Sequence, residues 1–216
     1  INKAIILAKK YLKSTPKERI PSLKRMIFSS SLDRTIAYYS SGASKETVTK
    51  SLLEAITYFE DGFKWEGFEK SYAMYDQIVW MLSLGILCAI EDTDFQRIVN
   101  IIKRDRASDK LLSKLINYRL PNTLNGSGYI QKSPYAELDI LVTGSDKSTL
   151  IIKRYLDKKW YQGHSDAPWH DIHKNTKVNN YFGYWAWEVG ALVKIFGIND
   201  EDLKNQQYYP YRANHW

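Results

Sequence analysis

Cysteine is nearly absent from the sequence, because Cys88 is the only one in 216 residues. A single thiol excludes an internal disulfide, and a chain without disulfides suits a reducing compartment, so we expect a cytoplasmic protein. Cys88 stands in the apolar run from Leu84 to Ile90, where a thiol ordinarily packs as a small hydrophobic side chain. We therefore expect no redox or nucleophilic role for it.

Long apolar runs are also missing. The longest, Ile78 to Ile90, is interrupted by Ser83 and falls short of the roughly 20 residues that a membrane-spanning helix needs. The first segment, Ile1 to Tyr11, carries three lysines and no small-residue cleavage site, unlike a secretory signal. We expect a soluble protein that makes no contact with a membrane.

The sequence motifs of common enzymes do not occur. There is no Gly-x-Ser-x-Gly elbow of a serine hydrolase and no His-Glu-x-x-His pair of a zinc protease. The stretch Asn125 to Gly128 is glycine-rich, but no Lys-Ser or Lys-Thr pair follows it, so it is a turn rather than a phosphate loop. These absences give no support to catalysis of these kinds or to a small-molecule substrate, and we expect neither.

The charge, by contrast, is plentiful and unevenly distributed. The chain carries a formal net charge of +7, of which residues 1–50 contribute +8 and residues 51–100 contribute −6. A basic start can attract nucleic acid, whereas an acidic middle can face a basic protein surface. Both blocks are also compatible with ordinary solvated helix faces. No DNA-recognition helix is evident, so direct nucleic-acid binding remains the weaker alternative.

Apolar residues recur at helical spacing nearly everywhere, and no alternating strand pattern is present. This predicts an all-α multi-helix bundle of about eight to nine helices in two closely packed halves, with no significant sheet. The strongest loop signal runs from Pro121 to Gly128, so we place the halves at residues 1–120 and 121–216.

Individual helices can be located by their caps and faces. Ser44 is a suitable N-cap for an amphipathic helix that reaches about Phe63, Asp94 is a candidate cap for a later helix, and Ser108 or Asp109 for another. The segment from Lys70 to Ile90 is apolar on all sides, which is typical of a central, buried helix.

The last segment, residues 181–216, is the richest in aromatic residues. Its apolar spacing predicts a helix from Tyr181 to Phe196, with Gly183 and Gly190 allowing a close approach to a neighbour and Gly197 ending it. Glu188 is the one acidic residue in this helix. Surrounded by aromatic rings, it must find hydrogen-bond donors or take up a proton. Tyr184 is one candidate donor, and a histidine or lysine of the preceding connection is the other. A structural role for Glu188 is favoured over a catalytic one.

This segment also carries a resemblance to a known family. The sequence Tyr-Phe-Gly-Tyr-Trp-Ala-Trp-Glu at 181–188, then Gly-Ile-Asn-Asp at 197–200 and Tyr-Tyr-Pro-Tyr at 208–211, resembles the C-terminal domain of the PoNi immunity proteins. The first half is similar to that family's N-terminal domain, most clearly at Leu32-Asp33-Arg34 and at Tyr38 to Gly42.

The resemblance implies an all-helical protein without catalysis or cofactor. Its implied partner is a PoNe-type DNase toxin that one bacterium delivers into a competitor, and its implied role is toxin neutralisation in a stoichiometric complex. We interpret the motif residues as determinants of the fold rather than as the toxin-binding surface. They are Tyr181, Gly183, Tyr184, Trp185, Trp187, Glu188, Tyr209 and Pro210.

The histidine-rich connection from His164 to His173 raises the alternative of a metal site. His164, His170 and His173 lie among carboxylates, and neutral imidazoles with carboxylates can bind zinc or iron. The order of these residues matches no metal motif. We therefore favour the interpretation that these histidines and carboxylates are polar groups that form hydrogen bonds with the aromatic segment or its neighbours. A metal-dependent enzyme built on this connection is the least favoured alternative, and we expect no metal.

The acidic middle supplies the predicted toxin-binding residues. Nucleases hold a basic surface for phosphates, which carboxylates of an inhibitor can cover, while exposed aromatic residues act as anchors. Two clusters would lie at the two ends of the buried helix, about 30 Å apart at a rise of 1.5 Å per residue. The residues are Glu60, Asp61, Trp65, Glu66, Phe68 and Glu69 in the first cluster, and Glu91, Asp92 and Asp94 in the second.

Overall fold

The fold was determined as a computed structural model, which describes residues 1–63, 71–105, 108–175, 177 and 181–216. These residues form helices and contain no strand, so the predicted all-α bundle is confirmed, with roughly the expected number of helices. None of the helices in these ranges is both long enough and apolar enough to span a bilayer.

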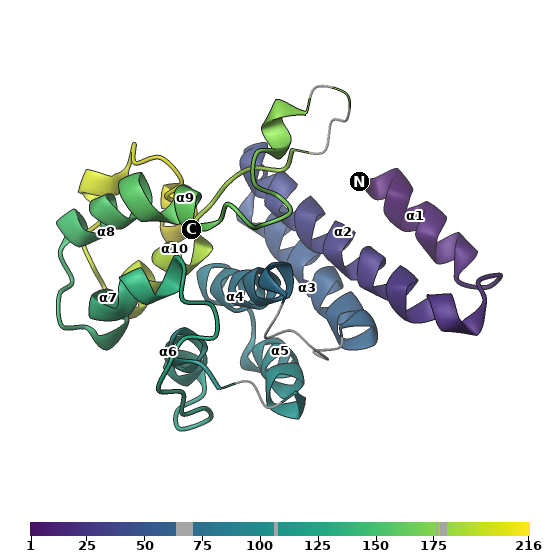
Figure 1. The fold of residues 1–216 in the computed structure, drawn as a ribbon, viewed down its shortest axis with the longest axis horizontal. Coiled ribbons are helices and arrows are strands. Elements are labelled where there is room, and N and C mark those ends of the chain that lie inside the picture. Colours follow the sequence, from purple (N-terminus) through teal and green to yellow (C-terminus); the bar gives the residue numbers. More distant parts are fainter. Residues whose placement is uncertain (64–70, 106–107, 176, 178–180) are drawn as a thin grey trace.

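Eleven α-helices succeed one another along this part of the chain (Figure 1). Their bounds are α1 Asn2–Tyr11, α2 Ile20–Ser40, α3 Lys45–Gly62, α4 Tyr72–Leu87, α5 Asp92–Arg104, α6 Lys110–Arg119, α7 Asp139–Thr143, α8 Thr149–Tyr155, α9 Tyr161–Gly163, α10 Trp187–Phe196 and α11 Tyr211–Asn214. Short 3₁₀ turns cover Lys17–Arg19, Tyr135–Leu138, Ile172–Lys174 and Glu201–Leu203, and a π-helical turn, Leu156–Trp160, links α8 to α9.

Side-chain caps begin two of the predicted helices. The Ser44 hydroxyl accepts a hydrogen bond from the Thr47 amide at 3.3 Å at the start of α3. The buried Asp109 carboxylate accepts one from the Leu112 amide at 3.0 Å at the start of α6. Both satisfy amides that the first helical turn leaves without a partner. The predicted cap Asp94 is wrong, because α5 begins at Asp92 and Asp94 lies inside its first turn.

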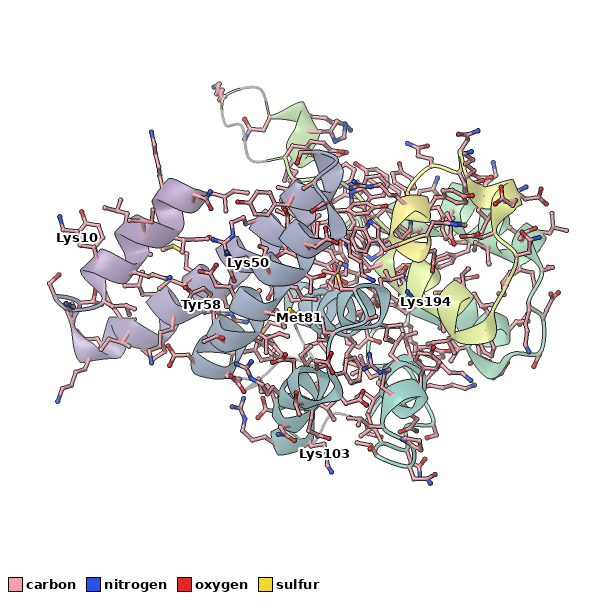
Figure 2. All side chains as sticks on the ribbon, turned by 180° about the vertical axis from the view of Figure 1, so that it is seen from behind. Lys10, Lys50, Tyr58, Met81, Lys103 and Lys194 are labelled. Atoms are coloured by element: carbon pink, nitrogen blue, oxygen red, sulfur yellow. The ribbon has the colours of Figure 1, made fainter. Side chains whose placement is uncertain are left out.

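Helix α4 is the centre of the molecule, as its apolar sequence predicted. Thirteen of its sixteen residues are buried. Figure 1 shows α4 between the pair α2 and α3 on one side and α6 and α10 on the other. Figure 2 gives the same order from behind, with Tyr58 of α3 and Lys194 of α10 on opposite sides of Met81 in α4. One continuous core therefore includes residues from Phe28 to Ala213, so the two halves are closely packed.

Helix α1 is attached differently, through a small core of its own. Ile5 and Ala8 of α1 pack on Ile27 of α2, apart from the main core. The remaining apolar residues of α1 are largely exposed, Ile6 at 68% and Leu7 at 52%. Helix α1 is thus the outermost element of the N-terminal side (Figure 1).

The predicted helix from Tyr181 to Phe196 is wrong at its first third. Helix α10 begins only at Trp187, and residues 181–186 form a non-helical segment that lies against the end of α2. There the Ser40 hydroxyl donates to the carbonyl oxygen of Phe182 at 2.6 Å and accepts from the indole nitrogen of Trp185 at 2.8 Å. Gly183, with φ of +111°, makes this close approach possible. Contacts with α2 therefore override the helical pattern of the local sequence.

Candidate protein-binding surface

Beneath the aromatic segment lies a buried polar network centred on Asp76 of α4. One carboxylate oxygen of Asp76 accepts from the hydroxyl of Tyr135 at 2.7 Å, and the other accepts from the indole nitrogen of Trp169 at 2.9 Å. His164 donates from Nδ1 to the carbonyl oxygen of Trp160 at 2.5 Å, and its Nε2 lies 3.8 Å from Asp76. The network joins α4 to three segments of the C-terminal half.

Burial disfavours the charged forms of both ionisable groups in this network. It raises the pKa of Asp76 to about 7, against hydrogen bonds from Tyr135 and Trp169 that favour the charged form. It lowers the pKa of His164 to about 3, so the imidazole is neutral near pH 7. Each shift has the sign expected when a charged form is removed from water. Asp76 and His164 are therefore not a strong ion pair, and the network is built to hold side chains in place.

Glu188 is buried in α10 next to this network. Its Oε1 accepts from the hydroxyl of Tyr155 at 3.2 Å. Burial raises the pKa of Glu188 to about 8, so the carboxyl is largely protonated at neutral pH. The candidate donor Tyr184 is wrong: residues 181–186 are not helical, so Tyr184 does not lie one turn from Glu188, and its hydroxyl contacts His173 instead.

The three histidines of the connection face different partners. His164 is buried against Trp160 and Tyr135, His170 stacks on the ring of Tyr161 at 4.2 Å, and Nδ1 of His173 lies 2.8 Å from the hydroxyl of Tyr184. In the part of the chain that the structure describes, no three His, Cys, Asp or Glu side chains converge as metal ligands would. The contacts agree with the favoured interpretation of these histidines as polar groups bonded to the aromatic segment.

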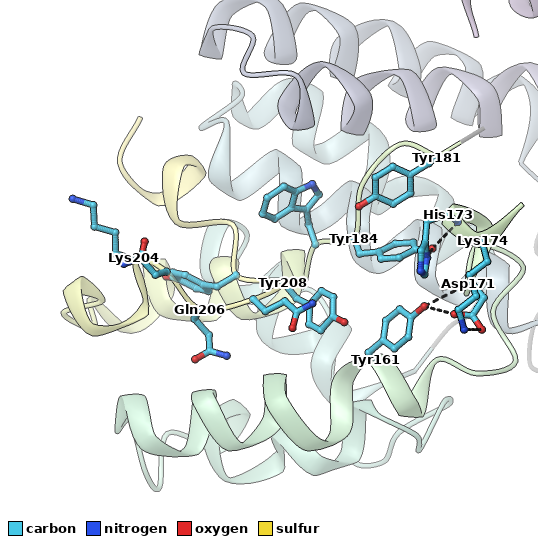
Figure 3. A pocket seen from close by; sticks show the side chains of 13 residues that line it. Tyr161, Asp171, His173, Lys174, Tyr181, Tyr184, Lys204, Gln206 and Tyr208 are labelled. Atoms are coloured by element: carbon cyan, nitrogen blue, oxygen red, sulfur yellow. Dashed lines mark hydrogen bonds and ion pairs between the residues drawn. The ribbon is translucent and has the colours of Figure 1, made fainter. Parts of the chain in front are cut away.

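A cavity of about 800 Å³ on the described surface is lined by tyrosines (Figure 3). Tyr161 of α9, Tyr181 and Tyr184 of the extended segment, and Tyr208 of the tail project into it. We call it the tyrosine cavity. Asp171, His173 and Lys174 lie along one side of it, and Lys204 lies at the opposite end.

Contacts among its own residues hold the tyrosine cavity in shape. The rings of Tyr161 and Tyr208 stack with centroids 5.5 Å apart, and the ring of Tyr184 lies 5.4 Å from that of Tyr161. Asp171 accepts from the hydroxyl of Tyr161 at 2.6 Å and from Lys174 at 2.8 Å. The hydrogen bonds from Lys174 and Tyr161 lower the pKa of Asp171 to about 2. Rigid aromatic side chains with a polar tip lose little entropy on binding, which suits a protein-binding surface.

The sequence motif of the C-terminal half contributes to both the interior and this cavity. Tyr181, Tyr184, Trp185 and Tyr209 line the tyrosine cavity. Trp187 and Glu188 are buried in the core, and Pro210 packs closely on Gly190 of α10. Sequence reasoning missed Tyr161 and Tyr208 as surface residues of the same cavity. The only signal for them was the high tyrosine content, 16 in the chain.

Of the predicted acidic residues, Glu60 and Asp61 lie on α3 and Asp92 and Asp94 lie on α5, and all four are in ion pairs. Arg97 binds Glu60 at 2.6 Å and Asp94 at 2.8 Å, so these two carboxylates share one guanidinium. The expected separation of the two clusters is wrong for this pair, because α5 packs beside α3. Asp92 binds Arg119 at 2.5 Å, and Asp61 binds Lys24.

Other members of the predicted set are less constrained or lie elsewhere. Glu91 is exposed, and no contact of its side chain is recorded among the described residues. Trp65, Glu66, Phe68 and Glu69 lie outside the residues that the structure describes. The described carboxylates are therefore close together, but their charge is largely compensated within the chain.

The basic start of the chain is partly compensated in the same way. Lys9 of α1 and Arg34 of α2 both contact Glu54 of α3, at 3.6 and 2.6 Å. Lys24 binds Asp61, as noted above. The basic and acidic blocks of the sequence are thus neighbours in the fold. Lys10 lies on the outer side of α1 (Figure 2), and no carboxylate partner is recorded for it among the described residues.

Comparison with known proteins assigns the chain to a family. The family model for the N-terminal part of PoNe immunity proteins (PoNi) matches residues 4–100, and the model for their C-terminal part matches residues 107–212. No curated protein matches. The crystal structure of protein PA2201 from Pseudomonas aeruginosa superposes with a TM-score of 0.69 over 99% of this chain and 86% of that one. At 16% sequence identity, this likeness concerns the fold alone. Because the two family models together match nearly the whole chain, it belongs to the PoNi family of PoNe immunity proteins.

Proposed function

We propose that the protein binds a PoNe toxin with DNase activity and neutralises it by forming a stoichiometric complex in the cytoplasm, without catalysis. The observation that carries the proposal is the match of both halves of the chain to PoNe immunity proteins. An immunity protein acts on a protein partner, so the relevant site is a surface rather than a catalytic cleft. The tyrosine cavity is the surface that best fits this role, so Tyr181 and Tyr184, interpreted from the sequence as fold determinants, are here proposed to contact the toxin as well.

Three features of the tyrosine cavity support protein binding. Tyrosine is among the residues that most often dominate the energy of protein interfaces. The rings are already held by stacking and by the Asp171 hydrogen bonds, so binding would order few side chains. Lys174 and Lys204 stand at its two ends, which gives the rim polar groups for orientation.

The acidic residues of α3 and α5 form a second part of the proposal. Glu60, Asp61, Glu91, Asp92 and Asp94 would attract the basic phosphate-binding surface of a nuclease and so speed association. Since four of these five carboxylates are in ion pairs, we assign them to steering rather than to the main binding energy. The undescribed residues Trp65, Glu66, Phe68 and Glu69 belong to the same proposal.

The experiment is a binding and inhibition assay with the nuclease domain of a PoNe toxin, taken from the same genome as this protein. We expect the two proteins to elute together as an equimolar complex and DNA cleavage to stop at equimolar protein. An absent complex together with undiminished cleavage, even at molar excess, would contradict the proposed function.

Two tyrosine variants locate the surface. Tyr181 and Tyr118 are comparably exposed, at 50% and 45%, but only Tyr181 lines the cavity. We expect Tyr181→Ala to weaken the complex by roughly tenfold, about 1.4 kcal/mol, as truncation of an interface tyrosine does. Tyr118→Ala, on α6, is the matched control and should leave the dissociation constant unchanged. Equal effects of the two substitutions would remove the tyrosine cavity from the interface.

A further inference from the structure

A second, smaller cavity of about 350 Å³ adjoins the segment that borders the tyrosine cavity. Ser29 and Asp33 of α2 and Gln77 and Trp80 of α4 form one part of its lining. Trp169 and Phe182 form the other part. We call it the Asp33 pocket. Its size lies within the range of pockets that bind small ligands or single side chains.

Asp33 is the only ionisable residue among the described residues that line this pocket. Its neighbour Arg34 does not neutralise it, because Arg34 binds Glu54 at 2.6 Å. No hydrogen bond or ion pair to the Asp33 carboxylate is recorded in the described part of the chain. Burial alone raises the pKa of Asp33 to about 7. A partly buried carboxylate without a partner is costly, and a cation in the pocket would remove that cost.

The walls of the pocket are aromatic and come from three parts of the chain. The ring centroid of Trp80 lies 5.9 Å from that of Trp169 and 6.4 Å from that of Phe182. The hydrogen bond to Asp76 at 2.9 Å fixes Trp169, and the bond from Ser40 fixes the backbone of Phe182. Electron-rich ring faces attract organic cations, most strongly when the site is shielded from water.

No positive charge competes for the carboxylate from within the described lining. The remaining polar groups, Gln77 and Ser29, bond to each other at 2.9 Å. The indole nitrogen of Trp80 is buried without a hydrogen-bond partner among the described residues. The pocket thus combines an unpaired carboxylate, aromatic walls and a polar pair joined by one hydrogen bond.

We propose that the Asp33 pocket binds the guanidinium group of an arginine side chain of the bound toxin. A guanidinium group pairs with a carboxylate through two parallel hydrogen bonds and stacks on aromatic rings, so it uses both features of the site. This inference rests on the proposed function and deepens it, because it names the chemistry of one anchor in the complex. The nuclease surface that binds DNA phosphates is a natural source of such an arginine.

The test compares Asp33→Asn with a matched control in the toxin-binding assay. The substitution would keep the shape of the side chain and remove its charge, and no contact of the folded chain would be lost. We expect the dissociation constant of the complex to rise about tenfold or more, because a charge of the partner would remain buried and unpaired. Glu18→Gln, at an exposed carboxylate before α2, should leave it unchanged. Both variants should melt no lower than the wild type.

A second part of the experiment tests whether the pocket binds a guanidinium group directly and whether the toxin competes for the same site. Ethylguanidinium is titrated into the free wild-type protein and into Asp33→Asn, and the indole N–H signals of Trp80 and Trp169 are followed by NMR. We expect saturable shifts in the wild type only, and we expect ethylguanidinium to compete with the toxin. Phe182→Leu, which retains bulk but removes the ring, should weaken both kinds of binding.

Three results would overturn the inference or its basis. Unchanged toxin affinity in Asp33→Asn would overturn it. Suppose that toxin affinity is unchanged in Asp33→Asn, while ethylguanidinium binds the wild type but not this variant. The pocket would then be a site for free small cations rather than for the toxin. Failure of the wild-type protein to bind the toxin would instead overturn the proposed function, and with it the partner named here.

Discussion

Glu188 shows how this protein accommodates a carboxyl group in an aromatic core. The side chain is fully buried, and Tyr155 donates a hydrogen bond to one of its oxygens. Because water is excluded, the neutral form is preferred and the pKa rises from the ordinary value of 4.5 to about 8. A protonated glutamic acid can donate as well as accept, which suits a site with few partners.

The protonation of Glu188 makes folding stability depend on pH in a predictable direction. Below about pH 4.5 the carboxyl is protonated in both the folded and the unfolded chain. Between 4.5 and about 8 the unfolded chain has lost the proton that the folded chain keeps, so this group's contribution falls as pH rises. Above about pH 8 it falls no further.

Glu188→Gln should remove this dependence. We expect its free energy of unfolding to rise relative to that of the wild type as pH increases between 4.5 and about 8, at up to about 1.4 kcal/mol per pH unit. Urea unfolding near both ends of that window measures the difference. Glu91→Gln, at an exposed position on the start of α5, is the control and should track the wild type. A difference between Glu188→Gln and wild type that is constant with pH would show that Glu188 is ionised in the folded protein.

At the scale of elements, the contact of residues 181–186 with α2 is the feature that the local sequence conceals. The bonds from Ser40 to Phe182 and from Trp185 to Ser40 tie the segment to the C-terminal end of α2. The adjoining tail adds Arg212, which donates to the carbonyl oxygen of Ala43 at 2.9 Å. The C-terminal half therefore holds the turn between α2 and α3 from two sides.

Gly183→Ala should break this contact. A Cβ atom there would collide with the Ser40 hydroxyl and approach the indole nitrogen of Trp185 to 2.6 Å, on a backbone with φ of +111°. We expect a loss of about 3 kcal/mol in unfolding free energy from strain and crowding together. Thermal or urea unfolding measures it.

Gly42→Ala is the control for backbone strain alone. Gly42 has φ of +84°, but a Cβ atom there would meet nothing within 4 Å. It should cost about 1 kcal/mol. Losses of equal size at Gly42 and Gly183 would mean that the segment does not press against Ser40.

Helices whose pattern and caps agree could be predicted from the sequence. Helix α3 begins after Ser44 as expected, and α4 is buried on all sides as its composition required. The start of α10 could not be predicted, because aromatic residues at 181–186 continue the helical spacing while their contacts with α2 favour an extended chain. A local pattern does not reveal a partner about 140 residues away in the sequence.

The candidate surfaces depend on the whole molecule and were less predictable still. The tyrosine cavity assembles Tyr161, Tyr184 and Tyr208 from three separate segments. The Asp33 pocket combines α2 and α4 with residues 168–172 and 182. Sequence alone identified Asp33 only as part of a family motif, and it selected acidic residues whose charge the fold largely compensates. Tertiary packing decides which polar residues remain without a partner.

The charge of the whole molecule bears on the alternative of nucleic-acid binding. The net charge is +7, but Lys9, Lys24 and Arg34 are engaged with Glu54 and Asp61. Fewer basic residues of the first two helices are therefore available to phosphates. Electrostatic binding through few contacts is weak and is abolished by salt.

We expect the isolated protein to be retained on double-stranded DNA only at low salt and to be released at about 0.15 M salt. A column or filter-retention assay over a salt series measures this. Lys10→Glu, on the outer side of α1, should reduce the retention at low salt. Tight retention at physiological salt that disappears in Lys10→Glu would favour a nucleic-acid-binding function over the proposed one.

The central position of α4 has a consequence for how such proteins can diversify. This helix belongs to the N-terminal half, yet α10 of the C-terminal half packs against it and Lys194 of α10 donates to the carbonyl oxygen of Leu87 at its end. A recombination event that joined the first half of one family member to the second half of another would set unmatched side chains against each other along α4. Under the proposed function, new toxin specificities would therefore arise more readily by point substitution around the surface cavities than by exchange of halves.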